Sequence, residues 1–181
     1  MCIRDSDRPY QLNVDTASTA AAAYIIGELK RDIKIPFGVD MLWDPMATIA
    51  LGTATKANFV REIFTGTYSS DMGIWAPNAG EALRYKQNLG SEEMLLIFNI
   101  SSEFSYSQDR RPLTDRARSV VFSSLPDAIL VSGQITGEAA SMNDLMSVKK
   151  ALPLTPVLAN TGVKHDTVIQ VLKNADGCIV G

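Results

Sequence analysis

The sequence predicts an α/β protein with a parallel sheet, and more specifically a (β/α)8 barrel of which about six βα units, strands three to eight, are present. Three observations lead to this fold class. Short apolar runs alternate with helical segments at intervals of about 20 to 35 residues, the size of a βαβ unit. The runs are almost continuously apolar, which indicates a sheet covered on both faces. Polar residues gather where the runs end, at the edge where barrels carry their sites.

The helices and strands follow one another in a regular order. A first helix is expected over 16–33, where Ala, Ile and Leu recur at helical spacing and Asp15 or Thr16 is placed as the N-cap. Asp44 and Pro45 supply an N-cap and a first-turn proline for the second helix. Further helices are expected near 78–90, 113–124, 142–152 and 165–175. The strands are expected near residues 35, 58, 94, 127, 156 and 177.

Polar residues stand near the carboxyl ends of five different strands, namely Asp40, Glu62, Asn99, Ser132 and Asn160. Each has an apolar residue or a glycine two positions earlier, so all five would share one face of their strands. In a closed barrel they would converge on the carboxyl-terminal rim, whereas in an open doubly wound sheet they would scatter along a line. Any one of them could simply meet solvent at the rim, but the set favours a site.

The last two strands are followed by glycines that are typical of a phosphate site. Barrels often bind phosphate between the loops after strands seven and eight, and Gly162 and Gly181 would let backbone N–H groups approach the anion. Glycine after a strand is also common turn chemistry, so the motif "NTGV" alone is a weak signal. The residues assigned to a phosphate or ligand site are Asn160, Thr161, Gly162, Gly181, Ser132 and Gly133.

Composition limits the classes of partner and compartment. The net charge of −3 argues against nucleic acid, and no apolar run approaches the roughly 18 to 20 residues that span a bilayer. Only Cys2 and Cys178 occur, so a reducing, cytoplasmic setting is expected. The first six residues, "MCIRDS", resemble adapter read-through at the head of a metagenomic fragment, so we take 7–181 as the barrel domain and 1–6 as a non-native leader.

Several long blocks in order carry a resemblance to a known family: "IPFGVDML", "FVREIFTGTYSSDMGIWAPNAGEALRYKQNLG", "RSVVFSSLPDAILVSGQITGEA", "VLANTGV" and "ADGCIVG". From Asp7 onward the chain resembles the BtpA/SgcQ family. The resemblance implies a ribulose-phosphate-binding barrel, places "DRPY" in the loop after a second strand that precedes this chain, and puts Gly162 and Gly181 at the phosphate site. In photosynthetic organisms the family name comes from photosystem I biogenesis. Asp40 stands where many members have Asn, and Glu103 follows the SgcQ-like branch, so no His-dependent mechanism carries over.

The residue types present narrow the chemistry. His165 is the only histidine and more readily serves as a surface or capping residue than as a base, and no strand lysine offers a Schiff base. The oxygen-bearing candidates for catalysis are Asp40, Glu62, Asn99 and Glu103, and they could also hold Mg²⁺ or Mn²⁺. Acid–base work by the Glu62 and Asp40 carboxylates beside a sugar carbonyl is the reaction we favour. Arg61, of opposite parity to Glu62, is expected to face the helices.

Two functions of different classes therefore stand. One is an enzyme of isomerase or epimerase type that binds a phosphorylated sugar or similar small metabolite, with a homo-oligomer allowed. The other is a noncatalytic biogenesis or assembly factor that keeps the barrel. The segment 65–77, with Tyr68, Asp71 and Trp75, would either close over a ligand or pack as a surface loop or subunit contact.

Overall fold

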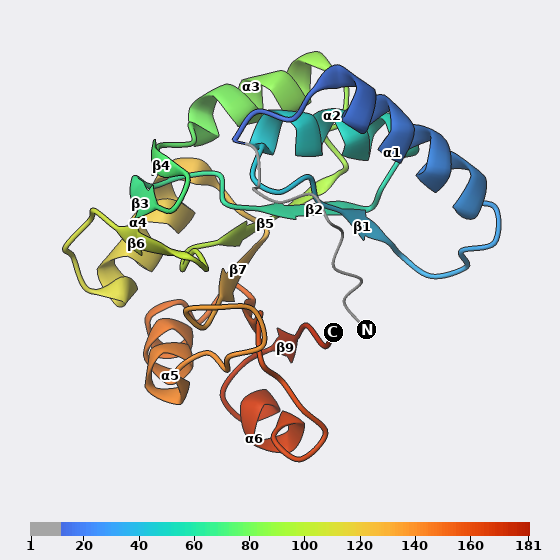
Figure 1. Ribbon diagram of the computed structural model, residues 1–181. Helices are drawn as coiled ribbons and strands as arrows, with labels where there is room; N and C mark the ends of the chain where they lie inside the picture. The colour runs from blue at the N-terminus through green and yellow to red at the C-terminus, as the bar shows by residue number, and fades with distance from the viewer. Residues whose placement is uncertain (1–11) are drawn as a thin grey trace.

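A computed structural model describes residues 12–181, so the leader 1–6 and the "DRPY" segment lie outside the described residues. Its main feature is a six-stranded parallel sheet in the order β1-β2-β5-β7-β8-β9 (Figure 1). The strands are β1 (Gly38–Val39), β2 (Phe59–Glu62), β5 (Leu95–Asn99), β7 (Ala128–Val131), β8 (Val157–Ala159) and β9 (Gly177–Cys178).

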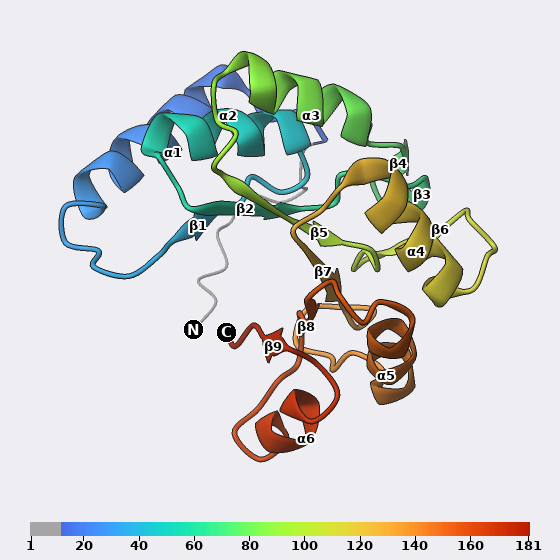
Figure 2. The same cartoon turned by 180° about the vertical axis from the view of Figure 1, so that it is seen from behind.

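The strand order follows the chain order, and the sheet curls into an open half-barrel. A doubly wound sheet would reverse its order at a switch point and carry helices on both faces. Here the helices lie on the outer, convex side, as Figure 1 and the reverse view in Figure 2 show. They are α1 (Thr16–Leu29), α2 (Pro45–Thr55), α3 (Ala79–Asn88), α4 (Leu113–Ser124), α5 (Met142–Ala151) and α6 (Val168–Leu172). The predicted α/β class and parallel sheet are confirmed, while completion to eight units stays a prediction.

The predicted helix starts are confirmed at the first two helices. Asp15 precedes α1 and its carboxylate accepts from the backbone N–H of Ser18 at 2.9 Å. Asp44 precedes α2, accepts from the N–H groups of Met46 and Ala47 at 3.0 Å each, and is followed by the expected proline. These bonds satisfy backbone donors that the first helical turn leaves free.

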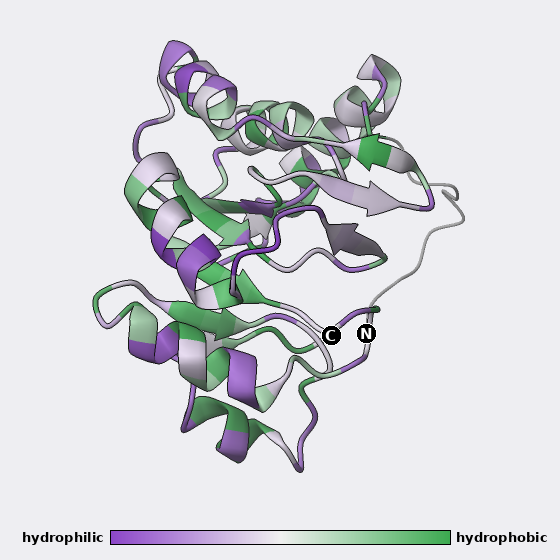
Figure 3. Ribbon diagram, turned by 90° about the vertical axis from the view of Figure 1, so that its left-hand side faces the viewer, coloured by the Kyte–Doolittle hydropathy of each residue, from purple (hydrophilic) through white to green (hydrophobic). Residues whose placement is uncertain are grey.

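The main hydrophobic core lies between the sheet and the outer helices. Val60, Phe98 and Ile129 are fully buried on the strands, and Ile49 and Leu51 of α2 pack against them. Figure 3 shows hydrophobic residues along strands of the parallel sheet, and helices on which hydrophilic and hydrophobic residues alternate. Packing of this kind fixes which strand residues point to the helices and which point inward.

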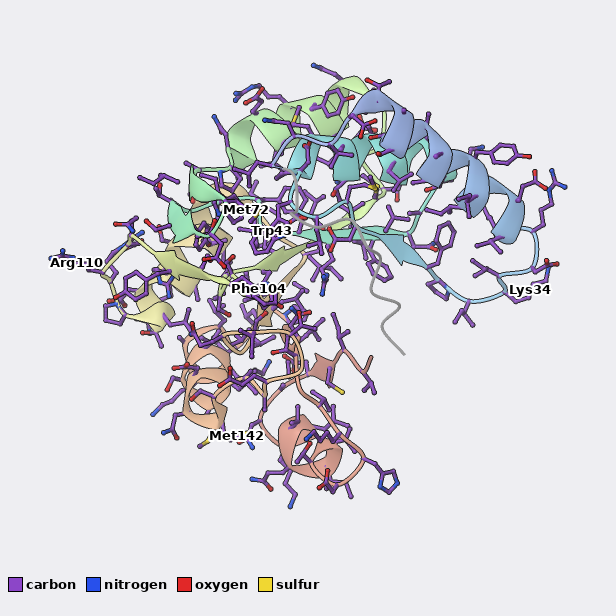
Figure 4. All side chains as sticks on the ribbon, viewed as in Figure 1. Lys34, Trp43, Met72, Phe104, Arg110 and Met142 are labelled. Atoms are coloured by element: carbon purple, nitrogen blue, oxygen red, sulfur yellow. The ribbon has the colours of Figure 1, made fainter. Side chains whose placement is uncertain are left out.

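A second, three-stranded antiparallel sheet was expected only as loop. β3 (Tyr68–Ser70) pairs with β4 (Gly73–Trp75) and with β6 (Ser105–Ser107) at the end of the molecule near α4. Its side chains form a small core in which the Trp75 ring stacks on Tyr68 at 4.9 Å and meets Trp43 edge-on at 5.0 Å. Figure 4 labels Trp43 in this region, together with Met72 and Phe104, which pack on the cluster. Tyr68 and Trp75 are thus packing residues, as the alternative of a packed loop supposed.

The strand register corrects the prediction for β2. Val39 pairs with Val60, which sets Asp40 beside Arg61, and Arg61 in turn pairs with Ile97, the residue two before Asn99. On the next strands Asn99 pairs with Leu130, and Leu130 pairs with Leu158. The inner side of the sheet therefore carries four of the predicted residues, namely Asp40, Asn99, Ser132 and Asn160. On β2 the inner position belongs to Arg61.

The expectation that Glu62 shares the inner face and that Arg61 faces the helices is therefore wrong by one residue. Glu62 has the parity of Val60, whose side chain packs in the helix-facing core, and is itself only 2% exposed. Arg61 instead reaches across the inner side to Asp40 and Asn160. The sequence pattern could not decide which of Arg61 and Glu62 points inward, because each of them has an apolar residue two positions earlier.

Candidate functional site

Arg61 lies at the centre of a polar network at the carboxyl edge of the sheet. Its guanidinium donates to Asp40 Oδ2 from Nη2 at 2.9 Å and from Nε at 3.3 Å, and from Nη1 to Asn160 Oδ1 at 2.7 Å. Asp40 follows β1 and Asn160 follows β8, so one side chain links strands from distant parts of the sheet. Burial works against the charged form, but Asp40 outweighs it and raises the pKa of Arg61.

Asn160 extends the network to the β5–β6 loop. Its Nδ2 donates to Glu103 Oε1 at 2.9 Å and to Ser132 Oγ at 2.7 Å. Asn99 Nδ2 donates to the second Glu103 oxygen at 3.1 Å, and Ser132 Oγ donates to Asn99 Oδ1 at 3.2 Å. The structure thus brings together three of the predicted strand-end residues, Asn99, Ser132 and Asn160, and adds the loop residue Glu103. Every polar group of the Asn160 amide is used.

Glu103 accepts two amide hydrogen bonds and is held in place by them. Burial raises the pKa of its carboxyl above the usual value, and the hydrogen bond to its own backbone N–H and the nearby Arg61 oppose the shift. Because its donors come from β5 and β8, Glu103 also fixes the spacing between those strand ends.

Asp40 and Glu62 form a close carboxyl pair. Burial raises the pKa of Glu62 well above its usual value, and the charge and hydrogen-bonding interaction with Asp40 raises it further. One Glu62 oxygen accepts from the Ile63 backbone N–H at 2.6 Å. Asp40 Oδ1 and Glu62 Oε2 are both buried and have no hydrogen-bond partner among the protein atoms of residues 12–181. Two such oxygens can be satisfied by one proton held between the carboxyls.

Access to this pair is unequal. The Asp40 side chain is 18% exposed and that of Arg61 is 28% exposed, whereas Glu62 lies fully behind them. A ligand on the inner side of the sheet would therefore meet Asp40 and Arg61. Sequence reasoning missed Arg61 as a site residue. Aligning β1 with β2 could have found it, because that alignment places an aspartate and an arginine side by side at the strand ends.

The glycines assigned to a phosphate site have other contacts in this structure. Gly162 has φ +65°, and a side chain there would run into the backbone of Ala139 in the β7–α5 loop. A side chain at Gly133 would meet the carbonyl of Glu138 in the same loop, and the Gly133 N–H donates to Thr161 Oγ1 at 2.6 Å. Gly133, Thr161 and Gly162 therefore hold the β7–α5 loop against the strand ends. Gly181 is exposed at the last described position.

The remaining residues considered for chemistry lie outside this network. His165 is exposed before α6, and Asp71 is exposed at the turn between β3 and β4. Within the described part of the chain, no group of three or more His, Cys, Asp or Glu residues is arranged to hold a metal ion. The helices described in 12–181 are all too short or too polar to cross a bilayer. Cys178 is a free, partly buried thiol on β9.

A curled parallel sheet with helices on its convex side and a polar network at its carboxyl edge defines a singly wound α/β protein of the half-barrel kind. The model of the BtpA family matches residues 2–181, and the chain belongs to that family.

Among its relatives, the putative sgc region protein SgcQ of Escherichia coli K12 is 46% identical over 94% of this chain and 64% of its own length. The photosystem I biogenesis protein BtpA of Synechocystis is 29% identical over 96% of this chain and 61% of its own length. This chain therefore spans less than two thirds of either relative. A nitroalkane oxidase structure from Streptomyces ansochromogenes aligns with a TM-score of 0.49 at 16% identity, over 95% of this chain and 48% of that one.

Proposed function

We propose that this chain binds a phosphorylated small metabolite on the inner side of its sheet and moves a proton on a carbon next to a carbonyl group of that ligand. The observation that carries the proposal is the neighbouring carboxyls of Asp40 and Glu62, each of which has one buried oxygen without a hydrogen-bond partner among residues 12–181. Burial and the neighbouring Asp40 raise the pKa of Glu62, so Glu62 is the member of the pair that more readily keeps a proton.

The difference in exposure supports separate roles for the two carboxyls. Asp40 is the accessible member and is the catalytic base that would touch the substrate. Glu62 is a positioning residue, since it is buried and reaches the substrate only through Asp40. Transfer of a proton from a C–H group to the Asp40 carboxylate leaves an enolate on the substrate, and return of that proton to the neighbouring carbon or the other face completes an isomerisation or epimerisation.

Arg61 would hold the anionic oxygen. Its guanidinium has five N–H donors, and three of them are used by Asp40 and Asn160. The two remaining donors suit an enolate oxygen or a phosphate oxygen of the ligand, which they can bind with charge-assisted hydrogen bonds. The strand-end glycines Gly162 and Gly181 are a second candidate for the phosphate, through their backbone N–H groups.

A divalent cation is compatible with this arrangement. The orphan oxygens of Asp40 and Glu62 are hard ligands, and Mg²⁺ or Mn²⁺ commonly uses two carboxylates together with substrate oxygens. The cation would stabilise negative charge on the substrate. Assays with and without added Mg²⁺ or a chelator therefore belong to the test.

The test combines ligand binding with exchange of the substrate proton. A panel of phosphorylated sugars is screened by thermal shift, and the best ligand is incubated in deuterated buffer and followed by ¹H NMR. Asp40→Asn is expected to abolish deuterium incorporation while binding is retained, and Arg61→Gln is expected to weaken binding. Asp71→Asn makes the same chemical change at an exposed turn and should behave as the parent protein.

Glu62→Gln is expected to move the pH profile of exchange, because it changes the environment of Asp40 without removing it. Exchange that survives in Asp40→Asn would refute the proposal. Absence of any ligand response, together with copurification of the protein with a membrane complex, would favour the assembly role that the name of the Synechocystis relative describes.

A further inference from the structure

A small hollow lies away from the network at Arg61. It has a volume of about 80 Å³ and is enclosed by α4, the small sheet and the β2–β3 connection, which Figures 1 and 2 show side by side. Arg116, Ser119 and Ser123 line it from α4, at the spacing of residues on one helix face. Thr65 and Ser107 line it from the opposite side.

Arg116 is the unusual group in this hollow. Its Nε is buried and has no hydrogen-bond partner, and no carboxylate of residues 12–181 forms an ion pair with its guanidinium. Asp109 and Arg111 also line the hollow. Hydrogen bonds from Arg111 at 2.6 Å and 3.0 Å lower the pKa of Asp109, with a smaller contribution from Arg116, so that carboxylate is already paired with Arg111. A buried guanidinium donor without a partner costs free energy, so its position calls for an anion.

Hydroxyl groups surround the guanidinium. Ser107 Oγ accepts from the Asp109 backbone N–H at 3.2 Å and keeps its own O–H proton to donate. Burial raises the pKa of Tyr68 to about 12, so its phenol stays protonated beside the hollow, where it donates to the Thr65 carbonyl at 3.1 Å. Arg116 and several hydroxyl groups line one hollow, with Arg111 occupied by Asp109. This set matches the oxygens of a tetrahedral anion, because each oxygen can accept from a separate group.

The backbone at the mouth of the hollow is shaped for this arrangement. Gly66 has φ +112°, a conformation that favours glycine, and a side chain there would contact the Tyr68 ring at 2.7 to 2.8 Å. The glycine therefore allows Tyr68 to lie under the β2–β3 connection and Thr65 to reach the rim. A volume of about 80 Å³ leaves room for a few water molecules or one small anion, and excludes a nucleotide.

We propose that this hollow binds a phosphate group, with Arg116 as its charged anchor and Ser107, Ser119 and Ser123 as hydroxyl donors. The site is separate from the proposed catalytic network, since none of its lining residues belongs to the Arg61 network. The phosphate is either the free ion or the end of a phosphate monoester whose remainder projects into solvent.

The test is a titration of the folded protein with inorganic phosphate at constant ionic strength, followed by ³¹P NMR line width. Arg116→Gln is expected to weaken phosphate binding by about tenfold or more, which corresponds to loss of a charge-assisted contact. Arg110→Gln removes the same charge from the neighbouring loop, where Figure 4 shows Arg110 projecting away from the molecule, and should bind as the parent does. Arg61→Gln should also retain this phosphate signal, which separates this proposal from the proposed function.

A second variant guards against loss of folding in Arg116→Gln. Ser119→Asp places a carboxylate one helical turn from Arg116, and is expected to abolish the phosphate binding that persists in Arg61→Gln while leaving the thermal midpoint unchanged or higher. A phosphate monoester titrated in parallel distinguishes the two sources, since binding of both compounds assigns an open site and binding of phosphate alone assigns the free ion. Unchanged phosphate binding in Arg116→Gln or Ser119→Asp, equal loss in Arg110→Gln, or no binding to the parent overturns the proposal.

Discussion

Replacement of Asn160 by Asp tests the polar network at its most connected residue. The Asn160 amide nitrogen lies 2.9 Å from Glu103 Oε1 and 2.7 Å from Ser132 Oγ, while its oxygen accepts from Arg61. Asp has the same shape but presents an oxygen where the donor stood. Two charges about 4 Å apart interact by about 4 kcal/mol at the effective dielectric constant of a protein surface. With part of this offset by Arg61, we expect the free energy of unfolding to fall by about 2 to 4 kcal/mol at pH 8.

The same substitution is expected to become less harmful as the pH falls. In the folded variant each carboxyl raises the pKa of the other, so the folded state binds a proton more tightly than the unfolded state. The penalty is therefore full above the raised pKa and is lost as the pH falls toward the usual carboxyl value. Protonation also restores a donor between the two side chains.

Urea unfolding at pH 8 and pH 5.5 measures this difference. The matched control is Asn58→Asp, because Asn58 uses its oxygen to accept from the Phe37 N–H at 3.0 Å and an aspartate can do the same. A penalty for Asn160→Asp that does not change with pH, or that is no larger than that of the control, would refute the account of the network.

Two further substitutions test the carboxyl pair and the β7–α5 loop. Glu62→Gln should raise the free energy of unfolding by about 1 kcal/mol or more at pH 8. The folded parent loses stability as the pH rises from the usual carboxyl pKa of 4.5 to the raised pKa of Glu62, whereas a glutamine at this position has no proton to lose. A urea midpoint of the parent protein that is equal at pH 5 and pH 8 would contradict this prediction. Gly162→Ala should lower the free energy of unfolding by about 2 kcal/mol or more, because Gly162 has a φ of +65° and a side chain there would contact the Ala139 backbone. The control is Gly27→Ala, since a side chain at Gly27 would enter open space. Equal melting temperatures for the two alanine variants would count against that role of Gly162.

The sequence contained enough information to predict the order of helices and parallel strands. Capping residues such as Asp15 and Asp44 act locally, and the bonds they make are within the first helical turn. The apolar run of β7 is buried at every residue, and the apolar run of β5 is long enough to be recognisable without knowledge of its partners. Local signals therefore located the elements of the main sheet.

The parts that could not be predicted depend on alignment between distant segments. Whether Arg61 or Glu62 points inward is decided by the pairing of β2 with β1 and β5, and both parities satisfy the local pattern. The small sheet pairs β3 with β6, which are separated by the whole of α3 and β5, and its strands are only three residues long. The close approach of Gly162 to Ala139 could not be predicted either, because Ala139 lies in a loop more than twenty residues earlier.

The charge balance of the Arg61 network predicts how an anionic ligand would bind. Asp40 and Arg61 form an ion pair that is neutral overall, and the remaining carboxyls, Glu62 and Glu103, both have a raised pKa. An arriving phosphate or enolate oxygen would be repelled by either carboxylate in its ionised form, so binding favours their protonated forms. Ligand binding should therefore take up protons, and affinity should fall as the pH rises through the raised values. Calorimetric titration in two buffers of different ionisation enthalpy measures the uptake directly, and Glu62→Gln should reduce it. Equal heats in both buffers would mean that these carboxyls do not respond to the ligand.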